Sequence, residues 1–260
     1  YYSTFAYVSE AKRLGLQIDP PDVALSTYRW TGAEMRVRVG LQAVRDLSRE
    51  TAEAILAARQ SSPFTGLADF LYRVHPADDE MRSLIDAGAM DGLAPGSNRS
   101  VLHWQATAGS GQRAAAPGRL FAPAPVVAPS LAPHNTVEQL RREYRALGFL
   151  CRHHPLNLVR GAAGRGLVKI GELASCVGRT VQLTGWLLTG KMVATKDGET
   201  MEFLTFEDET GLVETTFFPQ TYERYAHLLA GQRPYRLSGL VESDYGAVTL
   251  TVDRIEPLCR

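Results

Sequence analysis

The sequence has few cysteines, no excess of charge of either sign and no long apolar run. Only Cys151, Cys176 and Cys259 occur among 260 residues. They are too few and too scattered for a disulfide framework or a zinc site, so a reducing cytoplasm is the expected location. No apolar run approaches the roughly 18 residues of a membrane span, and no signal peptide opens the chain. Lysine plus arginine and aspartate plus glutamate both number 28, so the basic excess typical of nucleic-acid binders is missing.

The charges that are present are unevenly distributed. Residues 107–178 hold nine Lys/Arg against three Asp/Glu, whereas residues 179–260 hold eight against twelve. The second segment is mildly acidic, which argues against strong autonomous binding to a phosphate backbone. The length suits about two domains with real cores. The first residue is Tyr1 and not Met, so we expect a piece of a longer polypeptide.

The most informative segment is 181–257, where five short strands are predicted. Their ranges are 181–191, 201–207, 212–218, 235–241 and 247–255, with a helical stretch at 220–229 after the third. Apolar and polar residues alternate in these ranges, as in half-buried strands. Three strands, a helix and two strands is the order of the OB-fold, whose open face binds oligonucleotides or oligosaccharides. A nucleic-acid partner is therefore the first hypothesis.

The same alternation separates two faces of the predicted barrel. The residues predicted to face inward are Leu204, Phe206, Val213, Thr215 and Phe217. Trp186, Phe203 and Thr205 are predicted DNA contacts on the open face, where an aromatic ring can stack on an unpaired base. Lys191 and Lys196, in and after the first strand, are predicted backbone contacts. Packing of Trp186 against a neighbouring domain is an alternative.

Residues 40–106 are predicted to form a small all-α domain of short helices and tight turns. One short helix ends near Arg45, residues 46–48 form a tight connection, and residues 51–59 form a second helix with Ser48 as its N-cap. Further helices are predicted at 66–74, 80–87 and 98–105. Two helices joined by a tight hairpin can present N–H groups and a helix N-terminus to a phosphate. Helix-hairpin-helix units hold duplex DNA in this way without reading its sequence.

Arginines gather near this hairpin in the sequence. We expect phosphate contacts from Arg36, Arg38, Arg45 and Arg49, together with Ser48. The hairpin contains no glycine to let a backbone approach closely, so a helical packing module is the alternative. For each arginine, a simple solvated surface position is also open.

The remaining segments show no active site. Residues 107–135, rich in Ala, Pro and Gly, indicate a flexible linker, and residues 136–178 a helical connector with Thr136 as the cap of its helix. The acids at 207–209 precede Thr-Gly, which is typical of a turn and not of a metal site. His153 and His154 are predicted to lie in a loop. We find no catalytic residue, metal site or cofactor site in this chain.

Several stretches, taken in order, resemble the C-terminal region of the bacterial DNA polymerase III alpha subunit family. Residues 2–15 and 20–23 resemble the end of its fingers region. The stretches that resemble its tandem helix-hairpin-helix domain are 37–41 through 54–56, 63–70, and 84–91 with 98–99. Residues 143–150 and 154–156 resemble its connector, and residues 185–186, 196, 203–211 and 252–257 its OB domain.

The resemblance implies an α+β multidomain fold in which a small all-α helix-hairpin-helix domain precedes a five-stranded OB-fold barrel. The implied parts are a fingers-like end (1–39), the tandem helix-hairpin-helix domain (40–106), the linker (107–135), the connector (136–178) and the OB domain (179–260). It implies that the helical domain holds the primer–template duplex and the barrel the single-stranded template, in replication or translesion synthesis.

The resemblance also implies what this chain lacks. The family's palm domain, where aspartates and Mg²⁺ carry out nucleotidyl transfer, is absent, so we expect no cofactor and no polymerisation by this chain alone. The chain ends with the barrel, which is similar to the shorter error-prone members. Two alternatives stay open. One is a non-catalytic docking module for proteins of a replication or mutagenesis complex, and the other is a tRNA-binding barrel as in aminoacyl-tRNA synthetases, against which the helical block argues.

Overall fold

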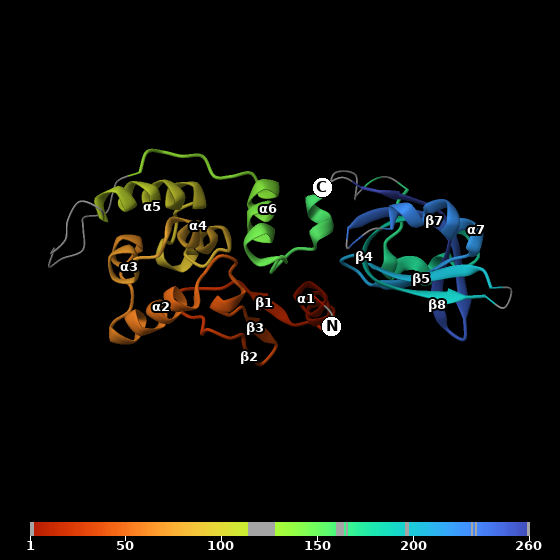
Figure 1. Ribbon diagram of the computed structural model, residues 1–260, viewed down its shortest axis with the longest axis horizontal. Helices are drawn as coiled ribbons and strands as arrows, with labels where there is room; N and C mark the ends of the chain where they lie inside the picture. The colour runs from red at the N-terminus through yellow and green to blue at the C-terminus, as the bar shows by residue number, and fades with distance from the viewer. Residues whose placement is uncertain are drawn as a thin grey trace. The chain divides into compact units, whose positions relative to one another are not determined.

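The structure is a computed structural model that describes residues 3–113, 128–159, 164, 166–195, 198–229, 231 and 233–258. It divides into two compact units, Tyr1–Arg152 and His153–Arg260 (Figure 1). The residues that we expect to connect the helical domain to the barrel are split between the two units. Within the described ranges, the helices lack the combined length and hydrophobicity of a membrane span.

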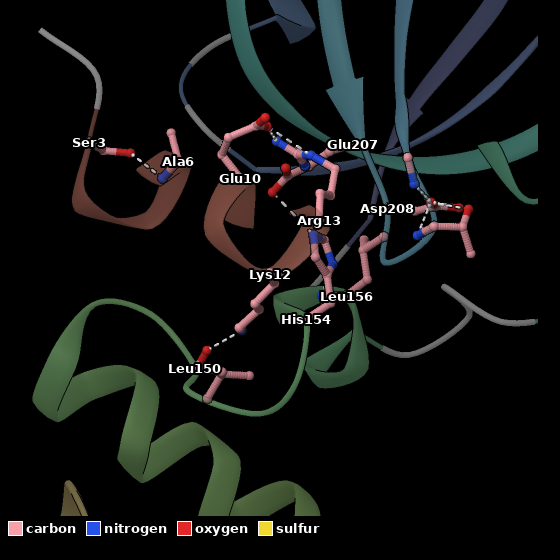
Figure 2. A network of polar contacts seen from close by, with 12 residues as sticks. Ser3, Ala6, Glu10, Lys12, Arg13, Leu150, His154, Leu156, Glu207 and Asp208 are labelled. Atoms are coloured by element: carbon pink, nitrogen blue, oxygen red, sulfur yellow. Dashed lines mark hydrogen bonds and ion pairs between the residues drawn. The ribbon is translucent and has the colours of Figure 1, made fainter. Parts of the chain in front are cut away.

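The first unit begins with a helix and a small sheet. Helix α1 (Thr4–Arg13) is capped by Ser3, whose hydroxyl accepts a hydrogen bond from the Ala6 N–H (Figure 2). Strands β1 (Gln17–Asp19), β2 (Thr31–Ala33) and β3 (Arg36–Arg38) form a three-stranded sheet in the order β1-β3-β2. Strand β3 is parallel to β1 and antiparallel to β2.

Short helices make up the rest of the first unit, as the sequence predicts. They are η1 (Leu41–Ala43), α2 (Arg49–Ser61), α3 (Leu67–Val74), α4 (Asp78–Asp86), η2 (Asp91–Leu93), α5 (Arg99–Arg113) and α6 (Thr136–Leu147). Their shared core contains Ile55, Phe70, Leu84, Ile85 and Met90, all fully buried. The first helix of the predicted hairpin is shorter than expected, because only one 3₁₀ turn forms before Val44 becomes extended.

Two helix boundaries differ from the prediction. Helix α5 runs on to Arg113, into the segment whose composition indicates a linker. Its small residues favour packing, since a Cβ at Gly109 would lie 3.2 Å from the Leu71 side chain of α3. The N-cap of α6 is Asn135, whose side chain accepts from the Glu138 N–H at 2.8 Å, so the prediction of Thr136 as the cap was one residue late.

The second unit is a closed five-stranded barrel, which confirms the predicted fold class. Its strands are β4 (Thr180–Ala194), β5 (Thr200–Glu207), β6 (Leu212–Phe217), β7 (Pro234–Asp244) and β8 (Ala247–Pro257), in the order β4-β5-β6-β8-β7. Helix α7 (Pro219–Tyr225) and η5 (Ala226–Leu228) connect β6 to β7, and η3 (Pro155–Leu158) and η4 (Ile170–Cys176) precede the barrel (Figure 1).

The barrel core contains the five residues predicted to face inward. Leu204, Phe206, Val213, Thr215 and Phe217 are all buried. The hydroxyl of Thr215 donates to the Leu204 carbonyl at 2.9 Å, so this polar group lies in the core with its hydrogen bond satisfied. Close strand approach requires glycine at Gly239, where a Cβ would lie 2.2 Å from the Thr251 carbonyl oxygen, next to the irregularity between Ser238 and Gly239.

Candidate nucleic-acid interface

The first hairpin adopts a glycine-like backbone without a glycine. Asp46 has φ +64°, a left-handed conformation that Asp tolerates better than most residues. Ser48 then caps α2, with its hydroxyl accepting from the Thr51 N–H at 3.1 Å, as predicted. Asp46 and Ser48 are both exposed, so the tip of this hairpin (residues 45–49) is open to solvent.

A buried carboxylate holds the hairpin from below. Glu80 of α4 is 6% exposed and accepts from the Ser48 N–H at 3.0 Å, the Thr51 hydroxyl at 2.9 Å and the Ala77 N–H at 2.8 Å. Burial alone would raise the pKa of Glu80, but the hydrogen bonds from Ser48, Ala77 and Thr51 outweigh it and the pKa is lowered. The Glu80 carboxylate therefore helps to hold the fold together, and the N–H of the cap residue Ser48 already donates to it.

The two arginines of the tip differ in their surroundings. Arg45 is exposed, and its backbone N–H donates to the Ala146 carbonyl of α6 at 2.8 Å. Arg49 pairs with Glu53 at 2.8 Å, and its guanidinium lies 5.6 Å from the centre of the Tyr28 ring. Both side chains of this pair are well exposed, so the ion pair is weak and can exchange for a phosphate.

Arg36 and Arg38 are engaged elsewhere. Both lie on β3 and both bind the carboxylate of Asp19, at 2.7 Å and 3.3 Å. The hydrogen bond from Arg36 is the largest cause that lowers the pKa of Asp19. The two guanidinium groups thus share a single carboxylate. Their closeness to the hairpin in sequence does not by itself place them at its tip.

A second hairpin joins α4 to α5. Gly88 has φ +83°, and a Cβ there would lie 2.3 Å from the Arg99 guanidinium, so glycine is required. Arg99 donates to the Asp86 carbonyl at 2.9 Å and to the Asp91 carboxylate at 2.8 Å. Asn98 caps α5 by accepting from the Val101 N–H at 3.1 Å. The arginine of this hairpin is therefore bound internally.

On the barrel, one row of paired residues crosses the outer face. We call Lys191, Phe203, Thr216, Thr251 and Leu240 the Phe203 row, because strand register places them side by side across β4, β5, β6, β8 and β7. Phe203 is half-buried, which leaves part of its ring accessible, and Lys191 beside it is exposed. Thr205, also half-buried, lies in the next row, opposite Glu214.

Trp186 does not belong to this face. Its side chain is 1% exposed, so the prediction of an accessible stacking ring at this position was wrong. Both faces of β4 are buried from Leu183 to Leu187, and the alternation rule assumes one open face. Lys196 lies outside the described residues.

The sequence interpretation missed one aromatic residue on the barrel. Tyr245 is fully exposed and has φ +47°, and Gly246 after it has φ +86°. Two positive φ values make a type I′ turn, where Asn or Asp normally precedes Gly. This turn joins the fourth and fifth strands, one of the two loops that contact ligands in OB-folds. A Tyr-Gly pair between two alternating strands is the sequence signal that identifies it.

The acidic turn after β5 is structural, as its sequence indicates. Asp208 is buried and accepts from the N–H groups of Thr210, Gly211 and Ile170 and from the Thr210 hydroxyl. Glu207 is fully buried and lies 3.2 Å from His154 Nε2 (Figure 2). His154 Nδ1 accepts from the Leu156 N–H, so Nε2 carries the proton that is donated to Glu207. In the described ranges, no three His, Cys, Asp or Glu side chains are grouped to hold a metal ion.

Comparisons with known families agree with this geometry. Residues 15–102 match the helix-hairpin-helix motif family. Residues 181–258 match the OB-fold nucleic acid binding domain family. Both predicted domain types are thereby confirmed, and the barrel is of a nucleic-acid-binding type.

The chain is similar to the C-terminal region of error-prone DNA polymerases over nearly its whole length. The error-prone DNA polymerase of Symbiobacterium thermophilum is 29% identical, with 99% of this chain and 28% of that protein covered. Those of Anaeromyxobacter sp. (strain K) and Alkalilimnicola ehrlichii are 30% and 32% identical, with 99% and 98% of this chain covered. The chain spans only 24% to 28% of the length of these three curated relatives.

Among solved structures, a domain of replication protein A from Methanococcus maripaludis covers 35% of this chain. Its sequence identity is 20% and its TM-score is 0.29.

Proposed function

We propose that this chain is the DNA-binding C-terminal region of an error-prone polymerase related to the DNA polymerase III alpha subunit. The observation that carries the proposal is the presence, in one chain, of an exposed helix-hairpin-helix tip and an OB barrel whose outer face has a partly accessible aromatic ring, Phe203. Its similarity to error-prone DNA polymerases supports the same assignment. In this proposal the helical unit holds the primer–template duplex and the barrel holds unpaired template.

The duplex would bind at residues 45–49 through its phosphates. Among the hydrogen bonds of the described residues, none uses the N–H of Arg49 or Glu50, which are first-turn donors of α2. Such donors, with the positive end of the helix dipole, suit an anion. Arg45 and Arg49 add charge on either side of Ser48. These contacts position a duplex and read no sequence.

Single-stranded DNA would bind along the Phe203 row. The Phe203 ring offers one stacking platform, worth about 1–3 kcal/mol per base. Tyr245 offers a second aromatic surface on a ligand-contacting loop. Lys191 is adjacent to Phe203 and would meet the phosphate next to a stacked base. Because the barrel segment is acidic, stacking must contribute more to this binding than charge does.

The proposal gives this chain no catalytic step. Polymerase activity and its Mg²⁺ would belong to the parts of the relatives that this chain does not cover. The described residues do not fit such a metal, because they contain no suitable group of ligands. We therefore expect DNA binding to persist in the presence of a chelator. We also propose a cytoplasmic setting, because the three scattered cysteines do not suit a disulfide framework.

Binding of three labelled DNAs to the 260-residue chain tests the proposal. The probes are a blunt duplex, a single strand and a primer–template junction, each followed by fluorescence anisotropy between about 50 and 200 mM salt. We expect the junction to bind most tightly and the duplex affinity to fall steeply as salt rises. Absence of binding at the lowest salt, or a salt-independent duplex affinity, would contradict the proposal and favour a protein-docking role. Preference for an equimolar tRNA competitor would favour a tRNA-binding barrel.

A further inference from the structure

The helical block carries too little positive charge to account for duplex binding by itself. Residues 40–106 contain six arginines, no lysine and nine Asp or Glu residues. Three of those arginines, Arg59, Arg73 and Arg99, already bind carbonyl or carboxylate groups of the fold. A protein binds a polyanion such as DNA mainly through cationic side chains, which neutralise phosphates and release their counterions. The duplex surface therefore needs a further source of charge.

Helix α6 lies where that charge is needed. The Arg45 N–H donates to the Ala146 carbonyl in the last turn of α6, at 2.8 Å. A main-chain hydrogen bond thus joins the tip of the first hairpin to this helix. Arg145 is the neighbour of Ala146, and Arg141 lies one turn earlier. Of the residues in α6, only Thr136, Val137, Arg141 and Arg145 are exposed.

The two exposed arginines of α6, Arg141 and Arg145, make few interactions with acidic side chains. Arg141 makes no ion pair among the described residues, and the Arg145 side chain is 66% exposed with Glu138 at 3.8 Å. Arg142, by contrast, is bound by Glu138 at 3.0 Å and lies 3.6 Å from Asp86. Like charges four residues apart destabilise a helix, so helix stability does not explain the spacing of Arg141 and Arg145. A row of phosphates along this face would explain it.

We infer that Arg141 and Arg145 of α6 form a second phosphate-binding strip, which continues the hairpin tip along the backbone of a DNA duplex. This inference rests on the proposed function and adds a third element to it. The strip binds phosphate groups of duplex DNA and reads no base. It lies outside the two helix pairs of the helix-hairpin-helix domain.

A purely structural role for Arg145 predicts a different result. A cation in the last turn complements the negative end of the helix dipole, and its loss would lower stability without changing DNA binding. Arg141 lies too far from the helix end for that effect. The salt dependence of duplex binding separates the two roles, because each phosphate contact contributes about 0.9 to the slope of log affinity against log salt.

The experiment compares four variants of the full chain with the unaltered chain. Arg141→Gln/Arg145→Gln removes the strip, and Arg141→Lys/Arg145→Lys keeps its charge. Arg45→Gln/Arg49→Gln alters the hairpin tip. Arg254→Gln on the barrel is the matched control, since its side chain is 68% exposed and makes a similarly weak ion pair, 3.5 Å from Glu256. Each is assayed with the blunt duplex over a salt series, and thermal unfolding confirms folding.

We expect the strip variant to reduce the slope by about 1.8 for two contacts and to weaken duplex binding. The lysine variant should restore the slope, and Arg254→Gln should leave it unchanged. A strip variant that binds like the unaltered chain, while the hairpin variant is weakened, would overturn this inference and leave the proposed function intact. No duplex binding by the unaltered chain would instead overturn the proposed function.

Discussion

The helical unit and the barrel present opposite chemistries to a nucleic acid. Around the first hairpin the exposed guanidinium groups of Arg45 and Arg49 and the first-turn N–H groups of α2 suit phosphate, although the carboxylates of Asp46 and Glu50 are exposed beside them. Across the barrel the accessible groups are the Phe203 ring, Tyr245 and threonines. Phosphate contacts are screened by salt, whereas stacking is much less so. One ligand with a duplex part and a single-stranded part would use both.

Two aspartates show how the units differ in detail. Asp46 and Asp208 both stand in tight turns. Asp208 is buried and accepts four hydrogen bonds, so its charge is used within the fold. Asp46 is exposed, with one hydrogen bond from Ser83 at 3.3 Å. In the barrel turn the Asp208 carboxylate is therefore fully hydrogen-bonded within the protein. In the hairpin turn the Asp46 carboxylate faces solvent, where it would meet a bound phosphate.

The largest expected effect follows from removing the anion under the hairpin. Glu80→Gln removes the charge and replaces one carboxylate oxygen by an NH₂ donor, which must face either the Ser48 N–H or the Ala77 N–H. Hydrogen bonds to charged groups are worth about 1.5–3 kcal/mol each, so we expect the helical unit to lose about 3 kcal/mol. Hydrogen exchange at residues 48–51 should accelerate and duplex affinity should fall.

The barrel serves as an internal reference for that variant. Exchange in β5 and β6, and affinity for a single strand, should stay unchanged. Glu53→Gln, which removes an exposed partner of Arg49, is the control and should change stability by no more than about 0.5 kcal/mol. Equal acceleration in both units would show that they do not unfold independently and would remove the basis for treating them separately.

The second-largest effect is expected at Phe203 on the barrel. Phe203→Ala should weaken single-strand binding by about 1–3 kcal/mol, the value of one stacked base. Duplex affinity should not change. Leu212→Ala, at an exposed apolar position on β6, is the control for lost apolar surface. If both variants weaken single-strand binding equally, the Phe203 row has no special role.

The sequence predicts the barrel well because its physical rule is local. Alternation places five strands within a few residues, and the core positions follow from the same pattern. The rule fails at Trp186, where both faces of β4 are buried. Alternation along one strand does not show whether other residues cover its outer face. The ion pairs of Arg36 and Arg38 with Asp19 were also not foreseen, because Asp19 lies on a different strand, β1.

The conformation of the hairpin could not be read from its residues either. The absence of glycine suggests a different turn, but Asp46 adopts the left-handed φ that glycine would supply. The role of Glu80 was equally hidden, since it lies 32 residues from Ser48. Contacts of this kind depend on the packing of α4 against the hairpin and not on local pattern.

A smaller effect is expected at Tyr245. Tyr245→Asn suits the left-handed conformation of a type I′ turn, so stability should rise slightly. The same change removes an exposed ring, so single-strand affinity should fall by about 1 kcal/mol. Opposite signs for the two quantities, measured by thermal unfolding and anisotropy, would identify a residue kept for binding at a cost in stability. Unchanged single-strand affinity would mean that the exposed ring does not contact DNA.

Acid should separate the units as well. Arg36 lowers the pKa of Asp19, and hydrogen bonds lower that of Glu80 despite its burial. Carboxylates with lowered pKa stabilise the fold above their ordinary values of 3.8 and 4.5, and this stabilisation is lost as pH falls through the lowered values. In the barrel, burial raises the pKa of Glu202, so acid favours the folded state there, although the lowered pKa of Glu209 partly offsets this.

Hydrogen exchange between about pH 7 and pH 3 should therefore show the first unit losing protection before the second. Asp19→Asn removes one of the titrating groups. It should reduce the loss of hydrogen-exchange protection at low pH in the first unit alone. Loss of protection in both units at one pH would contradict the assignment of these carboxylates to separate units.

The smallest effect concerns the charge on the hairpin tip. Asp46→Asn removes the negative charge while keeping a residue that tolerates positive φ, and Asp46→Gly also removes the conformational cost, about 1 kcal/mol. If duplex DNA lies on residues 45–49, both variants should bind it more tightly by a similar, few-fold factor, because charge and not backbone strain opposes the phosphate. Only Asp46→Gly should raise stability, offset in part by the lost bond from Ser83. A gain in affinity confined to Asp46→Gly would mean that backbone freedom limits binding. Unchanged affinity in both variants would place the duplex away from this tip.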